Sequence, residues 1–267
     1  MFILPTPSTV AFDLFGIPIY MYGIIMACSI FVAIIVSNSY FNKNNPLQFK
    51  DSIIEHSIYI IFSGILGARL YYCLLNVHYY IARPLEILDI RQGGLSIHGA
   101  ILGGIICLFF VSLKTRISLL KYLDAISVGT ILGQALGRWG NYFNSEAYGM
   151  PVKNQNWGVL IPESRRLPEF MQYSLYHPTF LYESVLDLFS FGVLSYIYFK
   201  FSHKKGVAFF SYLVFYSIIR FFIEQIRVDS ALNVGNVPIA QIVSVILFVV
   251  GLLGLLVVTF RMWLKKY

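Results

Sequence analysis

Residues 123–149 read LDAISVGTILGQALGRWGNYFNSEAYG, an apolar run that passes directly into a line rich in polar side chains. This line, residues 137–149, contains Arg138, Asn141, Asn144 and Glu146. A loop that only had to reach water could use Lys, Ser and Gly instead. The composition therefore indicates a segment that holds a polar ligand at the edge of a membrane span.

The composition of the whole chain is typical of a membrane protein. Its 267 residues are 57% hydrophobic and 12% charged, with a mean hydropathy of +0.69, whereas soluble domains carry about 25% charged residues. Seven apolar runs approach the span length of ~20 residues, at about 17–36, 53–75, 94–113, 119–136, 179–199, 207–226 and 238–260. We predict an all-α polytopic membrane protein with seven transmembrane helices, organised as a single domain over residues 1–267 with a loop region at about 137–178.

The distribution of Lys and Arg predicts the orientation. With the N-terminus outside, the short inner connections and the C-terminal tail hold more Lys and Arg than the longer outer segments, as the positive-inside rule requires. We therefore expect the N-terminus outside and the C-terminus in the cytoplasm. The net charge of +7 then reflects topology, and we expect no nucleic-acid partner. Residues 1–18 lack a basic n-region, so we expect the first span to remain in the mature protein.

The cysteines predict neither a metal site nor a redox role. Cys28, Cys73 and Cys107 all lie in apolar stretches, where a free cysteine behaves as a small hydrophobic side chain. The sequence has no CxxC motif and no Cys/His spacing of the kind that binds metals.

Unusual polar residues converge at one level of this topology. The expected level is the outer leaflet near the headgroups, whereas the inner ends of the spans carry ordinary lysines. The residues that reach it are Tyr22, Arg69, His98, His177, Glu183, Arg220 and the line at 137–149.

Residues 220–227, RFFIEQIR, place three charges at the outer end of the sixth span. Arg220, Glu224 and Arg227 are spaced i, i+4, i+7, which puts them on one helix face. A structural ion pair is one interpretation. The other is a functional site, because intramembrane ionisable residues are functional candidates and the guanidinium fork matches phosphate oxygens.

Residues 93–104, GGLSIHGAILGG, begin the third span. Gly99 and Gly103 form a small-xxx-small pair, which favours close helix packing. His98 is either a hydrogen-bonded structural residue or a proton acceptor, since its free pKa of ~6.5 suits proton transfer at neutral pH.

The lines at 137–149 and 177–184 also allow two interpretations each. Glycines in the first line let the backbone approach a ligand, although a structural re-entrant turn would use the same residues. In HPTFLYES, Glu183, with Asp187 one turn further on, either belongs to the site or simply neutralises an arginine.

These stretches, in this order, resemble the bacterial prolipoprotein diacylglyceryl transferase family. The resemblance covers roughly residues 18–229 and rests on PIYMYG, GGLSIHG, GRWGNYFNSEAYG, HPTFLYES and RFFIEQIRVD. It implies an enzyme of the bacterial inner membrane that moves the diacylglyceryl group of phosphatidylglycerol to the lipobox cysteine thiol of a prolipoprotein. A thioether would form and glycerol phosphate would leave, without a metal or other cofactor.

The resemblance and the polar stretches together give the expected site. We assign catalytic roles to His98, Arg138, Glu146, Arg220 and Glu224. We assign substrate binding to Tyr22, Arg138, Asn141, Asn144, Gly149, Arg220 and Arg227. Arg138 and Arg220 would bind the phosphate and stabilise charge as the C–O bond breaks. His98 is the first choice as acceptor of the thiol proton, and Glu224 or Glu146 the second.

Two other classes of protein could use intramembrane charges. A multi-pass transporter of an anionic solute would need them, but the chain halves show no convincing internal repeat and the charges gather at one level. A phospholipid-binding scaffold would need the arginines but no base. Turnover in detergent without a gradient separates an enzyme from both classes.

Overall fold

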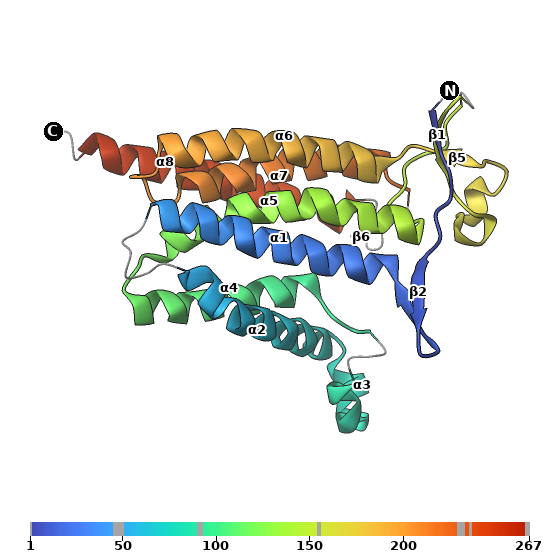
Figure 1. Cartoon of the computed structure of the whole chain (residues 1–267), viewed down its shortest axis with the longest axis horizontal. Helices are drawn as coiled ribbons and strands as arrows, with labels where there is room; N and C mark the ends of the chain where they lie inside the picture. Colours follow the sequence, from blue (N-terminus) through green and yellow to red (C-terminus); the bar gives the residue numbers. More distant parts are fainter. Residues whose placement is uncertain are drawn as a thin grey trace. The chain divides into compact units, whose positions relative to one another are not determined.

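The chain folds into two compact units that are connected through two long helices. A computed structural model describes residues 2–44, 51–89, 93–153, 156–228, 233–234 and 237–264. The first unit comprises Met1–Ser37 and Leu123–Tyr267, and the second comprises Asn38–Tyr122. Helices α1 (Met21–Lys43) and α5 (Leu119–Asn144) contribute to both units, and Figure 1 labels the long helices and several of the strands.

The other elements follow the predicted runs closely. The second unit contains α2 (Ser52–Leu75), α3 (Val77–Ala82), η2 (Pro84–Leu88) and α4 (Ile97–Thr115). The first unit contains α6 (Thr179–Lys200), α7 (Val207–Ile226) and α8 (Ile239–Leu264). It also holds the strands β1 (Phe2–Leu4), β2 (Val10–Leu14), β3 (Ile17–Tyr20), β4 (Trp157–Leu160), β5 (Leu175–Tyr176), β6 (Asn233–Val234) and β7 (Val237–Pro238), and the short helices η3 (Glu163–Arg165) and η4 (Pro168–Phe170).

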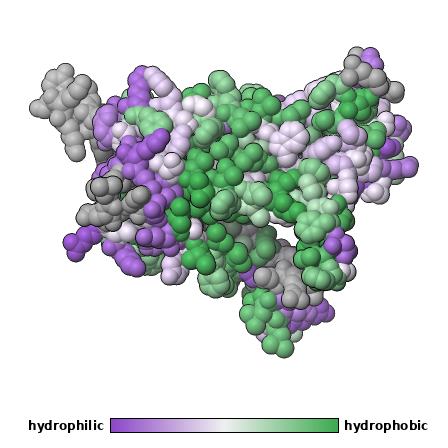
Figure 2. Space-filling view, viewed as in Figure 1, coloured by the Kyte–Doolittle hydropathy of each residue, from purple (hydrophilic) through white to green (hydrophobic). Residues whose placement is uncertain are grey.

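Within the described residues, six helices are long and apolar enough to cross a membrane: α1, α2, α4, α6, α7 and α8. The chain is therefore mostly helical and of a multi-pass type. Large hydrophobic side chains point outward, as lipid-facing residues do; on α6, Val185 and Phe189 are more than half exposed. Figure 2 shows hydrophobic side chains over the middle of this helix. Helix α5 is also long, with 26 residues, but its sequence includes Lys121, Asp124 and Arg138.

The structure corrects the predicted spans most at three ends. Residues 137–144 continue α5 as helix and are not loop, and the lack of a side chain on Gly140 lets Tyr22 pack against these last turns. The first span begins at Met21 and not at residue 17, because residues 10–20 form the antiparallel β2–β3 hairpin, and it continues to Lys43, beyond the predicted end at 36.

Close glycine packing joins α2 and α4 in the second unit, as the small-xxx-small pattern predicted. A Cβ atom on Gly99 would lie 2.2 Å from the carbonyl oxygen of Gly67, and one on Gly103 would lie 2.2 Å from that of Ser63. No larger side chain fits at this helix contact.

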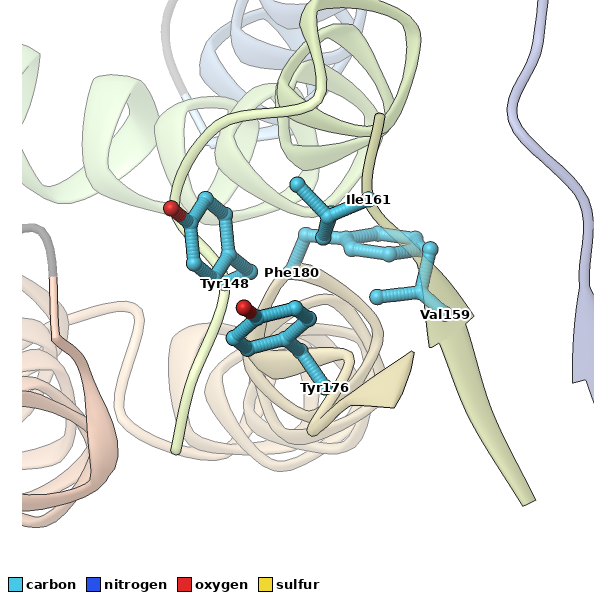
Figure 3. Close-up of a cluster of buried hydrophobic side chains, with 5 residues drawn as sticks. All are labelled: Tyr148, Val159, Ile161, Tyr176 and Phe180. Carbon is cyan, nitrogen blue, oxygen red and sulfur yellow. The ribbon is translucent and has the colours of Figure 1, made fainter. Parts of the chain in front are cut away.

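The loop region after α5 has its own small hydrophobic core in the first unit. Strand β1 pairs in parallel with β4, and β4 pairs antiparallel with β5. Figure 3 shows the core side chains, which are Tyr148, Val159, Ile161, Tyr176 and Phe180. The hydroxyl of Tyr176 donates to the carbonyl of Phe170 at 2.7 Å, and burial raises the pKa of this phenol. The core fixes the connection between the end of α5 and the start of α6.

Candidate active site

A buried glutamate lies at the centre of the charged residues in the first unit. The Glu183 side chain on α6 is 2% exposed, and its two carboxylate oxygens pair with arginines from two other helices. Arg138 of α5 contacts Oε1, and Nη1 of Arg220 on α7 lies 3.5 Å from Oε2. A buried charge is costly unless it is paired, so this arrangement fixes the three helices relative to one another.

The charges of α7 extend this arrangement, as their spacing predicted. Nη2 of Arg220 lies 2.5 Å from Oε2 of Glu224, and Nη1 of Arg227 lies 4.0 Å from the same oxygen. Arg138, Glu183, Arg220, Glu224 and Arg227 thus form one continuous chain of alternating charges, the arginine–glutamate cluster. Three arginines against two glutamates leave one positive charge.

Hydrogen bonds between elements hold the helices of the cluster in place. The hydroxyl of Ser184, next to Glu183, donates to the carbonyl of Ala135 on α5 at 2.8 Å. The hydroxyl of Thr179 donates to the carbonyl of Ala147 in the turn after α5. Both bonds are buried. The start of α6 is therefore held against the end of α5, which brings Glu183 to Arg138.

Asn141, Glu146 and Tyr22 lie beside the cluster. Nδ2 of Asn141 donates to Oε1 of Glu146 at 2.9 Å, and the backbone N–H of Glu146 donates to the carbonyl of Asn141. The positive φ angles of Ser145 and Ala147 produce the tight turn that allows this contact. Tyr22 packs against Gly140 and interacts electrostatically with Glu146 and Arg138. The structure thus brings these three predicted residues together.

Gly149 serves packing. Its N–H donates to the carbonyl of His177 at 2.8 Å, and its backbone forms an antiparallel bridge with Arg227. An added Cβ atom would lie 2.9 Å from side-chain carbons of both His177 and Thr179, so the position admits only glycine. Asn144 ends α5 and is partly exposed. Asp229, the last residue of the RFFIEQIRVD stretch, lies outside the described residues.

His98 and Arg69 belong to the second unit. His98 is the second residue of α4 and is exposed, with its ring 6.2 Å from that of Tyr71. Arg69 is buried and donates to backbone carbonyls of residues 86–94, including those of Ile87 and Gly93 at 2.8 and 2.9 Å. Arg69 therefore stabilises the conformation of the chain before α4, the helix that carries His98.

The sequence did not single out three polar side chains of the first unit that the structure places near the cluster. They are Gln134, one turn before Arg138, and Tyr212 and Tyr216, on the two turns before Arg220. The i−4 spacing from each arginine was the available signal. The sequence leaves open whether Glu183 belongs to the site or is a structural counter-charge, and its two ion pairs place it at the centre of the arginine–glutamate cluster.

The geometry suits the binding of one anion. The side chains of Arg138, Arg220 and Arg227 are 19%, 15% and 14% exposed, so part of each arginine remains accessible beside the buried carboxylates. A guanidinium edge can bind phosphate oxygens at two points. Among the described residues, no group of three or more His, Cys, Asp and Glu is arranged to hold a metal ion.

Comparison with known proteins identifies the family of the chain. A family model described as prolipoprotein diacylglyceryl transferase matches residues 9–257. Proteins named phosphatidylglycerol–prolipoprotein diacylglyceryl transferase are similar over most of the chain. The relative from Nostoc sp. is 39% identical over 95% of this chain and 90% of its own length. Those from Thermotoga maritima and Staphylococcus carnosus are 42% and 34% identical, over 81% and 97% of this chain and 72% and 93% of their own lengths.

Proposed function

The chain belongs to the prolipoprotein diacylglyceryl transferase family, and we propose that its arginine–glutamate cluster binds the phosphate of phosphatidylglycerol. The protein is a membrane transferase of lipoprotein biosynthesis and catalyses the first step of lipoprotein maturation. The observation that carries our proposal is the shared contact of Arg138 and Arg220 with Glu183. It holds two guanidinium groups close enough to bind one phosphate group.

The chemistry of the transfer explains why such a site is useful. The cysteine sulfur of the prolipoprotein forms a bond to the glyceryl carbon next to the phosphate, and the carbon–oxygen bond breaks. The electron pair of that bond goes to the phosphate, which leaves as glycerol phosphate. Arg138 and Arg220 stabilise the negative charge that develops on this leaving group. Glu183 and Glu224 keep the arginines ordered before the lipid arrives.

The thiol must lose its proton, because the thiolate is the reactive form. Glu183 and Glu224 are each held by arginines, and Glu146 accepts a hydrogen bond from Asn141. These three carboxylates are therefore already engaged with partners inside the protein. We therefore keep His98, which is exposed at the start of α4, as the proposed acceptor of the proton.

The remaining expectations complete the proposal. Helix α5 would be a seventh span, with the N-terminus outside and the C-terminus in the cytoplasm of a bacterial inner membrane. The protein substrate would be a prolipoprotein signal sequence with a lipobox cysteine, and nucleic acid would not bind. Tyr22, Asn141, Asn144, Gly149 and Arg227 would form or shape the lipid site around the phosphate, with Glu146 oriented by Asn141.

The test uses purified protein in detergent, phosphatidylglycerol and a synthetic lipobox peptide. Mass spectrometry should show a gain of one diacylglyceryl group on the peptide thiol. Arg138→Ala should abolish this gain, whereas the exposed Arg165→Ala, as the matched control, should retain it. Full transfer by the Arg138→Ala variant would exclude phosphate binding by this cluster. A wild-type protein that forms no product would exclude the activity itself.

A further inference from the structure

A row of polar side chains continues from the cluster along α5 and α7. Gln134 lies one turn before Arg138, and Tyr216 and Tyr212 lie one and two turns before Arg220. Residues four apart share a helix face. The hydroxyl of Tyr212 donates to Oε1 of Gln134 at 3.3 Å, which joins the two helices. The rings of Tyr212 and Tyr216 stack, with centroids 5.9 Å apart and an interplanar angle of 19°. These groups therefore form a continuation of the site and are not scattered.

Two hydrogen-bond donors in this row have no acceptor within the part of the chain that the structure describes. They are the hydroxyl of Tyr216 and the Nε2 amide group of Gln134. Both side chains are partly exposed, so a ligand can reach them. In the hydrocarbon region, unsatisfied polar groups are costly because no water replaces the missing partner. The row is thus suited to a ligand that brings acceptors into the membrane.

Electrostatic proximity connects these donors to the cluster. Tyr216 lies within electrostatic range of Arg138, Glu183, Arg220 and Asp187. A ligand group bound at Tyr216 is therefore close to whatever the arginines hold. The site has a charged part, which suits a phosphate, and an adjoining part that offers donors near the buried carboxylate of Asp187.

The dimensions of a phospholipid match this division. Four residues of helix rise about 6 Å, so Tyr216 and Gln134 lie about that far from the arginines along the helices, toward the middle of the spans. A lipid whose phosphate contacts Arg138 and Arg220 directs its acyl chains the same way. Its glycerol backbone then lies beside Tyr216 and Gln134. The two ester carbonyls of that backbone are acceptors without donors, which is the complement of what these side chains present.

We propose that Tyr216 and Gln134 bind the ester carbonyls of the diacylglyceryl group, so that the enzyme selects ester-linked over ether-linked phosphatidylglycerol. This inference rests on the proposed binding of the phosphate by the cluster. Tyr216 and Gln134 act as positioning residues. They hold the transferred group on one side of the breaking bond while the arginines hold the leaving group on the other, which restricts the reacting carbon to one position.

The experiment compares two lipids that differ only in the linkage. Purified wild-type protein is supplied with a lipobox peptide and either dioleoyl phosphatidylglycerol or its dioleyl ether analogue. We expect kcat/KM to be about 10- to 100-fold higher for the ester, because each hydrogen bond that the ether lipid cannot make to these donors lowers the rate by up to such a factor. Tyr216→Phe and Gln134→Met should each reduce this preference about 3- to 10-fold, by losing rate with the ester lipid alone. Tyr196→Phe is the control, because Tyr196 lies near the C-terminal end of α6, away from Glu183. It should retain the wild-type preference.

The outcomes separate this inference from the proposed function. Equal use of both lipids by the wild-type protein would overturn the ester site, while the transferase activity would stand. An unchanged preference in folded Tyr216→Phe and Gln134→Met variants would also overturn it. No transfer from the ester lipid to the peptide would instead contradict the proposed function. If a variant does not fold, the wild-type comparison of the two lipids still decides, because it needs no substitution.

Discussion

Replacement of Glu183 by glutamine tests whether the cluster depends on its central carboxylate. The substitution keeps the size of the side chain and removes the negative charge that pairs with Arg138 and Arg220. The loss of one partner from a buried ion pair typically costs 3–5 kcal/mol. We expect the lower end, about 3 kcal/mol, because both arginine side chains are partly exposed and Arg220 keeps its contact with Glu224.

This cost should be visible as a lower melting temperature. For chains of 150–250 residues, 1 kcal/mol shifts the melting temperature by about 2–4 °C, so Glu183→Gln should melt roughly 6–12 °C below the wild type. The assay is thermal unfolding in detergent micelles, followed by tryptophan fluorescence. Glu163→Gln is the control, because Glu163 is an exposed glutamate of η3 and exposed substitutions usually change stability by less than about 0.5 kcal/mol. Equal melting temperatures for the two variants would refute the argument that Glu183 is a required counter-charge.

Three further predictions concern packing and buried groups. Gly103→Ala should lower the melting temperature, because its Cβ atom would lie 2.2 Å from the Ser63 carbonyl oxygen. The neighbouring Gly104→Ala should not, because its Cβ atom would lie 3.8 Å from the nearest atom, in the Ile60 side chain. A lower melting temperature for Gly104→Ala than for Gly103→Ala would contradict the close contact of α2 and α4. Asp187→Asn should stabilise the protein by about 1–3 kcal/mol, because Asp187 is fully buried and neither carboxylate oxygen has a hydrogen-bond partner among the described residues. A denaturation midpoint of the variant below that of the wild type would show that the Asp187 charge is paired. Replacement of all three cysteines by alanine should leave transfer to the peptide intact, because the reacting sulfur belongs to the substrate, and an inactive but folded triple variant would disprove this.

The sequence predicted the helices well where hydropathy alone determines them. Helices α6 and α7 begin where the apolar runs at 179–199 and 207–226 begin, and end within one residue of them. It failed at α5, because the glycines and polar residues of 137–144 have the composition of a loop. In the structure these residues pack against a distant part of the chain, where Tyr22 lies against Gly140. Such a contact leaves no local pattern.

The same limit applies to the site. The i, i+4, i+7 spacing was sufficient to place Arg220, Glu224 and Arg227 on one face, and the ion pairs follow it. The partner of Arg138 could not be predicted, because no spacing rule relates an arginine on one helix to an acid on another. Arg69 shows the converse case. Its position along the second span suggested a place at the same membrane level as the other unusual polar residues. Its guanidinium group instead donates to backbone carbonyls of the connection between α2 and α4, whose conformation no local sequence pattern predicts.

The glutamates of the cluster also have a consequence for turnover. The phosphate of the substrate lipid is a diester with one negative charge, whereas the released glycerol phosphate is a monoester that carries about 1.5 to 2 negative charges at neutral pH. Three arginines without counter-charges would bind this product more strongly than the substrate, and product release would become slow. Glu183 and Glu224 offset two of these three positive charges. Under the proposed binding of the phosphate, the carboxylates that order the arginines would therefore also limit the affinity for the leaving group once the carbon–oxygen bond has broken.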